Sequence, residues 1–220
     1  MISKHRPNPP YAYVIVGAAV IILVSLWGVY FSFGIFFKSM MAEFGWTRAM
    51  ISGGFSLASL TSGFTAAILG WLNDRIGPRK VMTLCGIFLG AGCLLLSRTD
   101  SLIYFYICYG LIIGFALGGG FIPLMSTVTR WFEADRGLMT GIVLFEIGGG
   151  VMIGPLVSGL LISTNDWRVS YLTIGISALI LLIIISQFLR RDPAKLGQLP
   201  YGETEITGDE LVLANRDLSY

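Results

Sequence analysis

The sequence predicts an all-α membrane protein with six transmembrane helices and both termini in the cytoplasm. Three observations carry this prediction. The 220 residues have a mean hydropathy of +0.76, and only 13% of them are charged, whereas about a quarter of a soluble chain is charged. Charge-free runs of about 20 residues, the length that crosses a bilayer core, recur along the chain. Basic residues gather on one side of the bundle that these runs would form.

The six apolar segments are expected to be helices, because backbone groups in lipid have no water to bond and must pair within the segment. We place these helices at about residues 12–37, 49–72, 81–98, 102–130, 138–163 and 169–189. Together they form a transmembrane bundle at 12–191, with a cytoplasmic segment at 1–11 and a polar cytoplasmic tail at 192–220. The apolar run that begins at Tyr11 is about twice too long for a signal peptide.

The distribution of lysine and arginine sets the orientation of this bundle. One side collects most of the basic residues: Lys4, Arg6, Arg75, Arg79, Lys80, Arg130, Arg136, Arg190, Arg191 and Lys195. The opposite side has fewer of them: Lys38, Arg48, Arg98 and Arg168. Because cytoplasmic loops carry the excess of positive charge, the first side and both termini are expected to face the cytoplasm, across an inner or plasma membrane.

The most informative short segment lies between the second and third predicted helices and reads Gly70-Trp71-Leu72-Asn73-Asp74-Arg75-Ile76-Gly77-Pro78-Arg79-Lys80. Gly77-Pro78 predicts a tight turn, since glycine permits unusual backbone angles and proline cannot continue a helix. An ordinary basic turn needs neither an acid nor two glycines in register. The spacing resembles the signature loop of the major facilitator superfamily of secondary transporters. The residues that match this signature are Gly70, Asp74, Arg75, Gly77, Arg79 and Lys80.

This resemblance implies that the chain is one half of a major facilitator fold, built as two repeats of three helices. The substrate site of such a protein lies between two six-helix halves. The second half would be a further segment, or a second copy of the chain in a dimer. The resemblance also implies that Asp74 holds the cytoplasmic side closed, and Arg130 at the end of the fourth helix is its candidate partner.

Three further segments resemble the branch of the superfamily that contains monocarboxylate transporters and oxalate/formate antiporters. They are Phe44 to Ala49, Asn165 to Arg168, and Arg191 to Gly202. This branch implies transport of small organic anions, either monocarboxylates or dicarboxylates, by proton symport or anion exchange.

The superfamily lines its substrate path with the first and fourth helices. The candidate path residues on those helices are Tyr30, Ser32, Tyr106 and Tyr109. Their hydroxyl groups can bind a carboxylate, although each of these side chains also suits ordinary helix packing.

Glu146 is the only acidic residue inside a predicted membrane segment. An ionised carboxylate at that depth is costly, so it should be protonated, paired, or exposed to a water-filled cavity. Glu146 is therefore a candidate carrier of a coupled proton. The alternative is a structural ion pair with a base at the cytoplasmic end, Arg130 or Arg136.

Glycines of the fifth predicted helix resemble a motif of proton-coupled drug antiporters, except that Ser158 replaces a glycine. The matching residues are Gly141, Gly150, Gly154, Pro155 and Gly159. A drug/proton antiporter half is therefore an alternative function. Glycines four residues apart also let membrane helices pack closely, and we expect packing at three such sets: Gly86 and Gly90, Gly110 with Gly114 and Gly118, and Gly150 and Gly154.

Other classes of function have no support in the sequence. The single histidine, His5, lies outside the predicted bundle, and no metal-ligand cluster or nucleophile–base pair is evident, so we expect neither an enzyme, a cofactor nor a metal. Cys85, Cys93 and Cys108 lie inside apolar runs and are expected to be packing residues. Nucleic acid is not an expected partner, because the basic residues follow membrane topology. A truncated, non-transporting membrane module that needs a second half remains an alternative.

Overall fold

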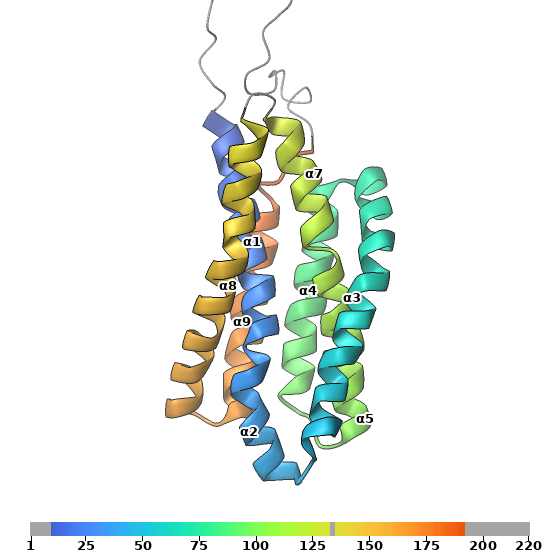
Figure 1. The fold of residues 1–220 in the computed structure, drawn as a ribbon, viewed down its shortest axis with the longest axis vertical. Coiled ribbons are helices and arrows are strands. Elements are labelled where there is room, and N and C mark those ends of the chain that lie inside the picture. Colours follow the sequence, from blue (N-terminus) through green and yellow to red (C-terminus); the bar gives the residue numbers. More distant parts are fainter. Residues whose placement is uncertain (1–9, 133–134, 192–220) are drawn as a thin grey trace, which may run out of the picture.

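A computed structural model describes residues 10–132 and 135–191 of the chain. Within these ranges the chain forms a bundle of helices whose axes run roughly alongside one another (Figure 1). Six spans of the described residues are long and apolar enough to cross a membrane, and each overlaps one of the predicted segments. The prediction of an all-α, multi-pass membrane protein is therefore confirmed. The tail at 192–220 and most of the segment at 1–11 lie outside the described residues.

The spans have the following bounds. The first consists of α1 (Pro10–Phe31) and α2 (Phe33–Phe44), the second of α3 (Arg48–Ile76), and the third of α4 (Pro78–Leu96). The fourth contains α5 (Leu102–Phe105), the π-helix η1 (Tyr106–Ile113), α6 (Gly114–Gly118) and α7 (Phe121–Trp131). The fifth is α8 (Arg136–Thr164) and the sixth is α9 (Trp167–Ser186).

The first span is longer than the predicted helix at 12–37, and it is interrupted at Ser32. The Ser32 hydroxyl donates a hydrogen bond of 2.6 Å to the Gly28 carbonyl, which also accepts the Ser32 N–H at 3.0 Å. Serine bonding of this kind tends to bend helices. The chain resumes as α2 and ends only at Phe44, before Gly45 with φ +64°. The predicted end at residue 37 was therefore wrong, because the charge of Lys38 does not end the helix.

The turn between the second and third spans is shorter than the sequence suggested. We expected helices to end at 72 and restart at 81, but α3 continues to Ile76 and α4 begins at Pro78. Gly77 alone separates them, with φ +84°, and its N–H bonds to the Asn73 carbonyl at 2.9 Å. Pro78 occupies the first helical position. An N–H group at that position would have no hydrogen-bond partner within the helix, so the lack of one in proline costs nothing. The predicted turn at Gly77-Pro78 is confirmed, and most of the charged motif lies on helix ends.

The fourth span is irregular along its length. Its π-helix is followed by α6, and then a turn at Gly119 and Gly120 leads into α7. Glycines let this span approach α3 very closely, since a Cβ added at Gly114 would lie 2.9 Å from the Ala58 carbonyl oxygen. A single helix at 102–130 was predicted here, and the π-helix was not foreseen because it leaves no simple pattern in the sequence.

Close helix pairs organise the bundle. α1 lies beside α8, α4 beside α9, and α3 beside the fourth span, so that α8 and α3 lie on opposite sides of the molecule in Figure 1. The predicted glycine sets occur at these three contacts. For example, a Cβ added at Gly90 would lie 2.5 Å from the Leu179 Cβ. Inside lipid no hydrophobic effect drives helices together, so their association depends on close packing. Small residues allow that close approach.

Both ends of the described chain lie at the same end of the bundle as the turn between α3 and α4, which contains Gly77 (Figure 1). The Tyr11 hydroxyl donates to the Phe188 carbonyl at 2.6 Å, and the Trp131 indole donates to the Arg190 carbonyl at 2.9 Å. These bonds join the start of α1 and the end of α7 to the residues that follow α9. We call this the Gly77 end, and the opposite end, where α2 meets α3, the Gly45 end.

Candidate functional site

Asp74 is the centre of a charged cluster at the Gly77 end. Its Oδ1 atom lies 3.8 Å from Nη2 of Arg130 on α7 and 3.9 Å from Nη2 of Arg191, which follows α9. Arg191 also donates a hydrogen bond of 2.5 Å to the Asp74 carbonyl oxygen. The cluster therefore joins the ends of the second, fourth and sixth spans. We call these three residues the Asp74 cluster.

Two members of the Asp74 cluster are open to solvent, and Arg191 is partly buried. The side chain of Asp74 is 63% exposed and that of Arg130 is 43% exposed. Exposed ion pairs contribute only about 0–1 kcal/mol to stability, because water screens the charges and long side chains lose entropy on pairing. The cluster can therefore set the relative positions of helix ends, yet separate at a small cost in free energy.

The other residues of the predicted motif have separate contacts. The Arg75 guanidinium lies 4.0 Å from the centre of the Trp71 ring, on the same helix. Arg79 Nε donates to Gln187 Oε1 at 2.7 Å, which links α4 to the end of α9. Lys80 is exposed. A Cβ added at Gly70 would meet only ordinary contact, 3.6 Å from Ile122 Cγ2, so close helix approach does not require that glycine.

Sequence reasoning named Arg130 as a partner of Asp74, and the structure brings these two side chains together. It missed Arg191, which was placed on the same membrane side without a partner. The two residues are 117 positions apart, so no local pattern links them. Only the packing of the end of α9 beside the end of α3 shows the contact.

A second polar cluster, which the sequence did not predict, lies at the Gly45 end. Glu43 Oε1 accepts a hydrogen bond of 2.6 Å from Arg168 Nη2, and Glu43 Oε2 accepts one from the Trp167 indole. Arg168 also donates to the Thr99 carbonyl at 2.8 Å. Glu43 on α2 is thereby tied to the start of α9 and to the segment that joins the third and fourth spans. The sequence had drawn attention to the neighbouring segments Phe44 to Ala49 and Asn165 to Arg168. It contained no sign that the two segments contact each other.

We expect Glu43→Gln to lower the stability of the bundle, because the amide keeps the shape of the side chain and loses the charged acceptor. Hydrogen bonds to charged groups contribute about 1.5–3 kcal/mol, and the 39% exposure of Glu43 reduces this to roughly 1 kcal/mol. Thermal unfolding in detergent measures the effect. In a double-mutant cycle with Arg168→Gln, the two losses should be clearly less than additive. Fully additive losses would show that the pair contributes nothing.

Glu146 lies on α8, one turn before Gly150, and is only 2% exposed. Neither of its carboxylate oxygens has a hydrogen-bond partner within residues 10–132 and 135–191. The alternative of an ion pair with Arg130 or Arg136 is not what the structure shows, since Arg130 lies beside Asp74 and Arg136 Nε donates to the Phe132 carbonyl at 2.9 Å. A buried carboxyl group without a partner favours its neutral, protonated form.

The glycine motif of α8 divides between two faces. Gly150 and Gly154 lie against α1, where a Cβ added at Gly154 would be 2.5 Å from the Gly28 Cα. Pro155 follows within the helix. Gly141 and Gly159 have no neighbouring atom within 4 Å of an added Cβ. Close contact between backbones therefore accounts for two of these glycines, and the other two lie on open surface.

The four candidate path residues have different surroundings. The Tyr30 hydroxyl shares a hydrogen bond of 2.8 Å with Ser59. Ser32 and Tyr109 are buried, and the Tyr109 hydroxyl donates to the Tyr30 carbonyl at 3.3 Å. The Tyr106 hydroxyl donates to the Met50 carbonyl at 2.7 Å. Three of the four hydroxyls thus bond to backbone carbonyls. Tyr30 also lines a cavity.

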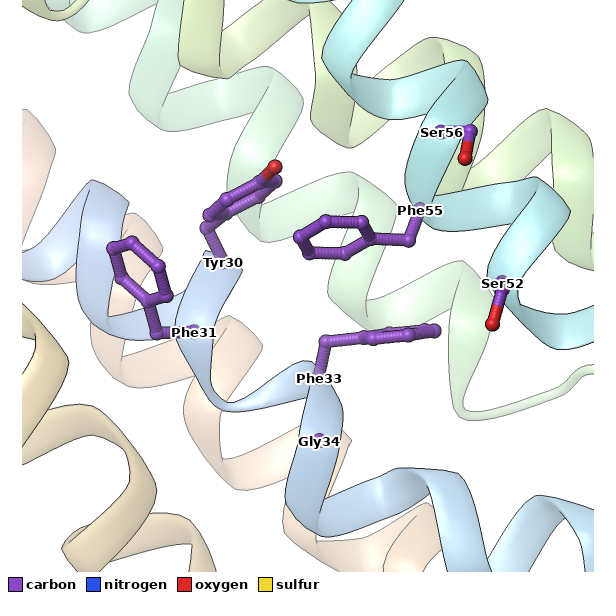
Figure 2. Close-up of a pocket in the computed structure, with 7 residues that line it drawn as sticks. All are labelled: Tyr30, Phe31, Phe33, Gly34, Ser52, Phe55 and Ser56. Atoms are coloured by element: carbon purple, nitrogen blue, oxygen red, sulfur yellow. The ribbon is translucent and has the colours of Figure 1, made fainter. Parts of the chain in front are cut away.

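This cavity has a volume of about 300 Å³ and lies where α1 and α2 face α3 (Figure 2). Four aromatic rings, two serines and a glycine line it: Tyr30, Phe31, Phe33, Phe55, Ser52, Ser56 and Gly34. We call it the Tyr30 cavity. Sequence reasoning looked to the first and fourth spans for the path, so it missed Ser52, Phe55 and Ser56 on the second span.

Metal ligation finds no support in the described part of the chain. No group of three or more His, Cys, Asp or Glu side chains lies close enough together there to hold a metal ion. Cys85, Cys93 and Cys108 are buried and unpaired with one another. They lie among apolar neighbours, as packing residues do.

Comparison with known proteins places these features in a family. Residues 14–215 match the Major Facilitator Superfamily domain. Monocarboxylate transporter 13 of Rattus norvegicus is 30% identical over 175 residues, covering 78% of this chain and 41% of that protein. The oxalate:formate antiporter of Oxalobacter formigenes is 27% identical over 180 residues, covering 81% of this chain and 42% of that protein.

A probable sulfoacetate transporter of Cupriavidus necator is 24% identical over 168 residues, covering 76% of this chain and 39% of that protein. The chain thus spans less than half the length of each of these relatives. They are transporters of small organic anions by name, and they match the branch that the sequence segments resemble. The family match covers nearly the whole bundle, from the first span to beyond the sixth. The chain is an integral membrane protein that belongs to the Major Facilitator Superfamily, a family of transporters and not of enzymes.

Proposed function

We propose that the chain forms the amino-terminal half of a secondary transporter for small organic anions, in particular monocarboxylates. The observation that carries this proposal is the family match, together with relatives named for monocarboxylates, oxalate and sulfoacetate. In this proposal the Gly77 end faces the cytoplasm, because the basic residues gather there. The Asp74 cluster holds that end closed and separates as the two halves rock.

The substrate site of the proposed transporter lies between this half and a second six-helix half. The chain spans 41% of its monocarboxylate relative, so the second half is either further sequence or a second copy of the chain. Exposed apolar residues on α3 and α8 offer a surface for it or for lipid. They include Phe64 with 76% exposure and Phe145 with 81% exposure.

Glu146 is the proposed carrier of the coupled proton. Its burial without a partner suits a group that is protonated in one state of the transport cycle and must find water or a cation in another. We expect Glu146→Gln to retain exchange of substrate for substrate and to lose the stimulation of net uptake by an inward proton gradient. The measurement is uptake into proteoliposomes across a range of external pH. Unchanged stimulation in Glu146→Gln would exclude this role and leave anion exchange without a proton.

The drug/proton antiporter is the second candidate, and the glycines of α8 are its one specific observation. Their contact with Gly28 explains Gly150 and Gly154 by packing alone, and Gly141, Pro155 and Gly159 remain as support for this function. A third alternative is a membrane module that does not transport.

Uptake by the full-length gene product in a host without carboxylate carriers distinguishes these functions. We expect labelled lactate uptake that unlabelled carboxylates inhibit and that cationic drugs do not. Inhibition by cationic drugs alone, or extrusion of such drugs, would favour the antiporter. Correct insertion without any transport of either class would favour the non-transporting module.

A further inference from the structure

We propose that the Tyr30 cavity is the subsite for the apolar body of the cargo, and that the preferred substrates are therefore monocarboxylates with an aromatic or branched aliphatic group. Compact dianions such as oxalate would be poor substrates. This inference rests on the proposed function and adds a selectivity to it.

The walls of the cavity are aromatic and mutually supported. The rings of Tyr30 and Phe55 stack with their centres 4.6 Å apart and an interplanar angle of 26°. The Phe33 ring lies 5.2 Å from the Phe55 ring and 4.8 Å from the ring of buried Tyr109. Figure 2 shows the rings of Tyr30, Phe33 and Phe55 between the first span and α3. Because neighbouring rings hold one another in place, the cavity is preformed. Binding of an apolar group then costs little free energy for ordering these side chains.

The absence of charged residues in the cavity favours an apolar occupant. None of its seven lining residues carries a charge. Apolar surface that leaves water gains about 25 cal/mol per Å², whereas an ionised carboxylate without a paired cation is strongly disfavoured in such a place. A dianion would have to place two charges near this wall, but a monocarboxylate with an apolar group can direct its single charge away from it.

The hydroxyl groups of Ser52 and Ser56 lie along one border of the cavity, and Ser59 continues their row on α3. Ser52, Ser56 and Ser59 are exposed on α3 at spacings of four and three residues, so they share one helix face. The apolar residues Leu60, Phe64 and Ile68 are exposed on a neighbouring face of the same helix. The serine face is better suited to water or cargo than to hydrocarbon, because exposed hydroxyls lose hydrogen bonds in lipid. An aromatic cavity beside a row of hydroxyls matches a molecule with one apolar and one polar end.

The size of the cavity limits its occupant. At about 300 Å³, it is at the lower end of the range of about 300–1,000 Å³ for small-molecule sites. One aromatic ring or a branched chain of a few carbons fits this space. The cavity therefore suits the apolar group of a small organic acid.

The proposal is tested first on the unmodified, full-length gene product in proteoliposomes. Acetate, 4-methyl-2-oxopentanoate, phenylacetate and oxalate compete with labelled lactate in counterflow. We expect the two bulky monocarboxylates to compete at concentrations at least about tenfold lower than acetate, because a few additional apolar carbons in a fitted pocket increase affinity by about this factor. Oxalate should compete least. Equal or better competition by oxalate would overturn the subsite. If no carboxylate at all supported counterflow, the proposed function itself would fail.

A variant of the cavity gives an independent test. Ser56→Phe adds a ring to the cavity, and we expect it to reduce the preference for phenylacetate over acetate by about tenfold. Leu60→Phe adds a similar bulk one turn along α3, on the exposed apolar face, and should leave the preference unchanged. An unaltered preference in Ser56→Phe, or an equal loss for both competitors, would show that the cavity does not select cargo. If Ser56→Phe does not insert, the competition series on the unmodified protein still decides.

Discussion

Asp74→Asn is expected to abolish transport while the protein inserts and folds normally. The substitution keeps the size of the side chain and removes the charge that Arg130 and Arg191 approach at 3.8 and 3.9 Å. Because these pairs are exposed, the bundle should lose at most about 1 kcal/mol of stability. The closed state at the Gly77 end depends on the same charge, so its loss disturbs the equilibrium between the two access states. Counterflow of labelled lactate and thermal unfolding in detergent measure the two effects separately.

The control for this variant is Asp100→Asn, which removes an exposed carboxylate at the Gly45 end. It should retain transport. Asp74→Glu keeps the charge and should retain a measurable fraction of activity. Wild-type rates in Asp74→Asn would refute the gating role, and a large loss of folded protein would show that the charge stabilises the fold instead.

Gly154→Ala is expected to be the most destabilising single-methyl change in α8. An added Cβ would lie 2.5 Å from the Gly28 Cα. The other atoms nearest to it also belong to the Gly28 backbone, which cannot rotate away as a side chain can. α1 and α8 must therefore separate, and overpacking of this kind costs about 1–3 kcal/mol, occasionally more. We expect a lower melting temperature in detergent and a lower yield of folded protein.

Gly148→Ala is the matched control on the same helix, since nothing lies within 4 Å of its added Cβ. Alanine also disfavours the unfolded chain relative to glycine, so this variant should be neutral or more stable by up to about 1 kcal/mol. Equal melting temperatures for the two variants would mean that α1 and α8 do not pack through these glycines.

Local features of the sequence predicted the spans and the turn at Gly77. Hydropathy and proline act over a few residues, and Gly77 can adopt its positive φ because glycine has no Cβ. The ends of the helices were less predictable. Lys38 and the charges after Leu72 looked like boundaries, but long charged side chains can extend toward water from inside a helix end.

The sites were less predictable than the spans, because they depend on how the helices are rotated and paired. The candidate path residues Tyr109 and Ser32 have hydroxyls that bond to backbone carbonyls, and the sequence did not show which carbonyls these would be. Phe55 was not singled out in the sequence, yet it lines the Tyr30 cavity. Glu43 and Arg191 were unassigned, since each of them meets a partner more than 100 residues away in the sequence.

Counterflow by the purified, full-length protein tests the central claim most directly. Proteoliposomes loaded with unlabelled lactate are diluted into a trace of labelled lactate. A carrier with alternating access exchanges the two, so the label should accumulate transiently inside, and Asp74→Asn vesicles should resemble protein-free ones. Absence of accumulation with lactate, with the bulky monocarboxylates and with oxalate, from protein shown to be folded, would contradict the assignment as an organic-anion transporter.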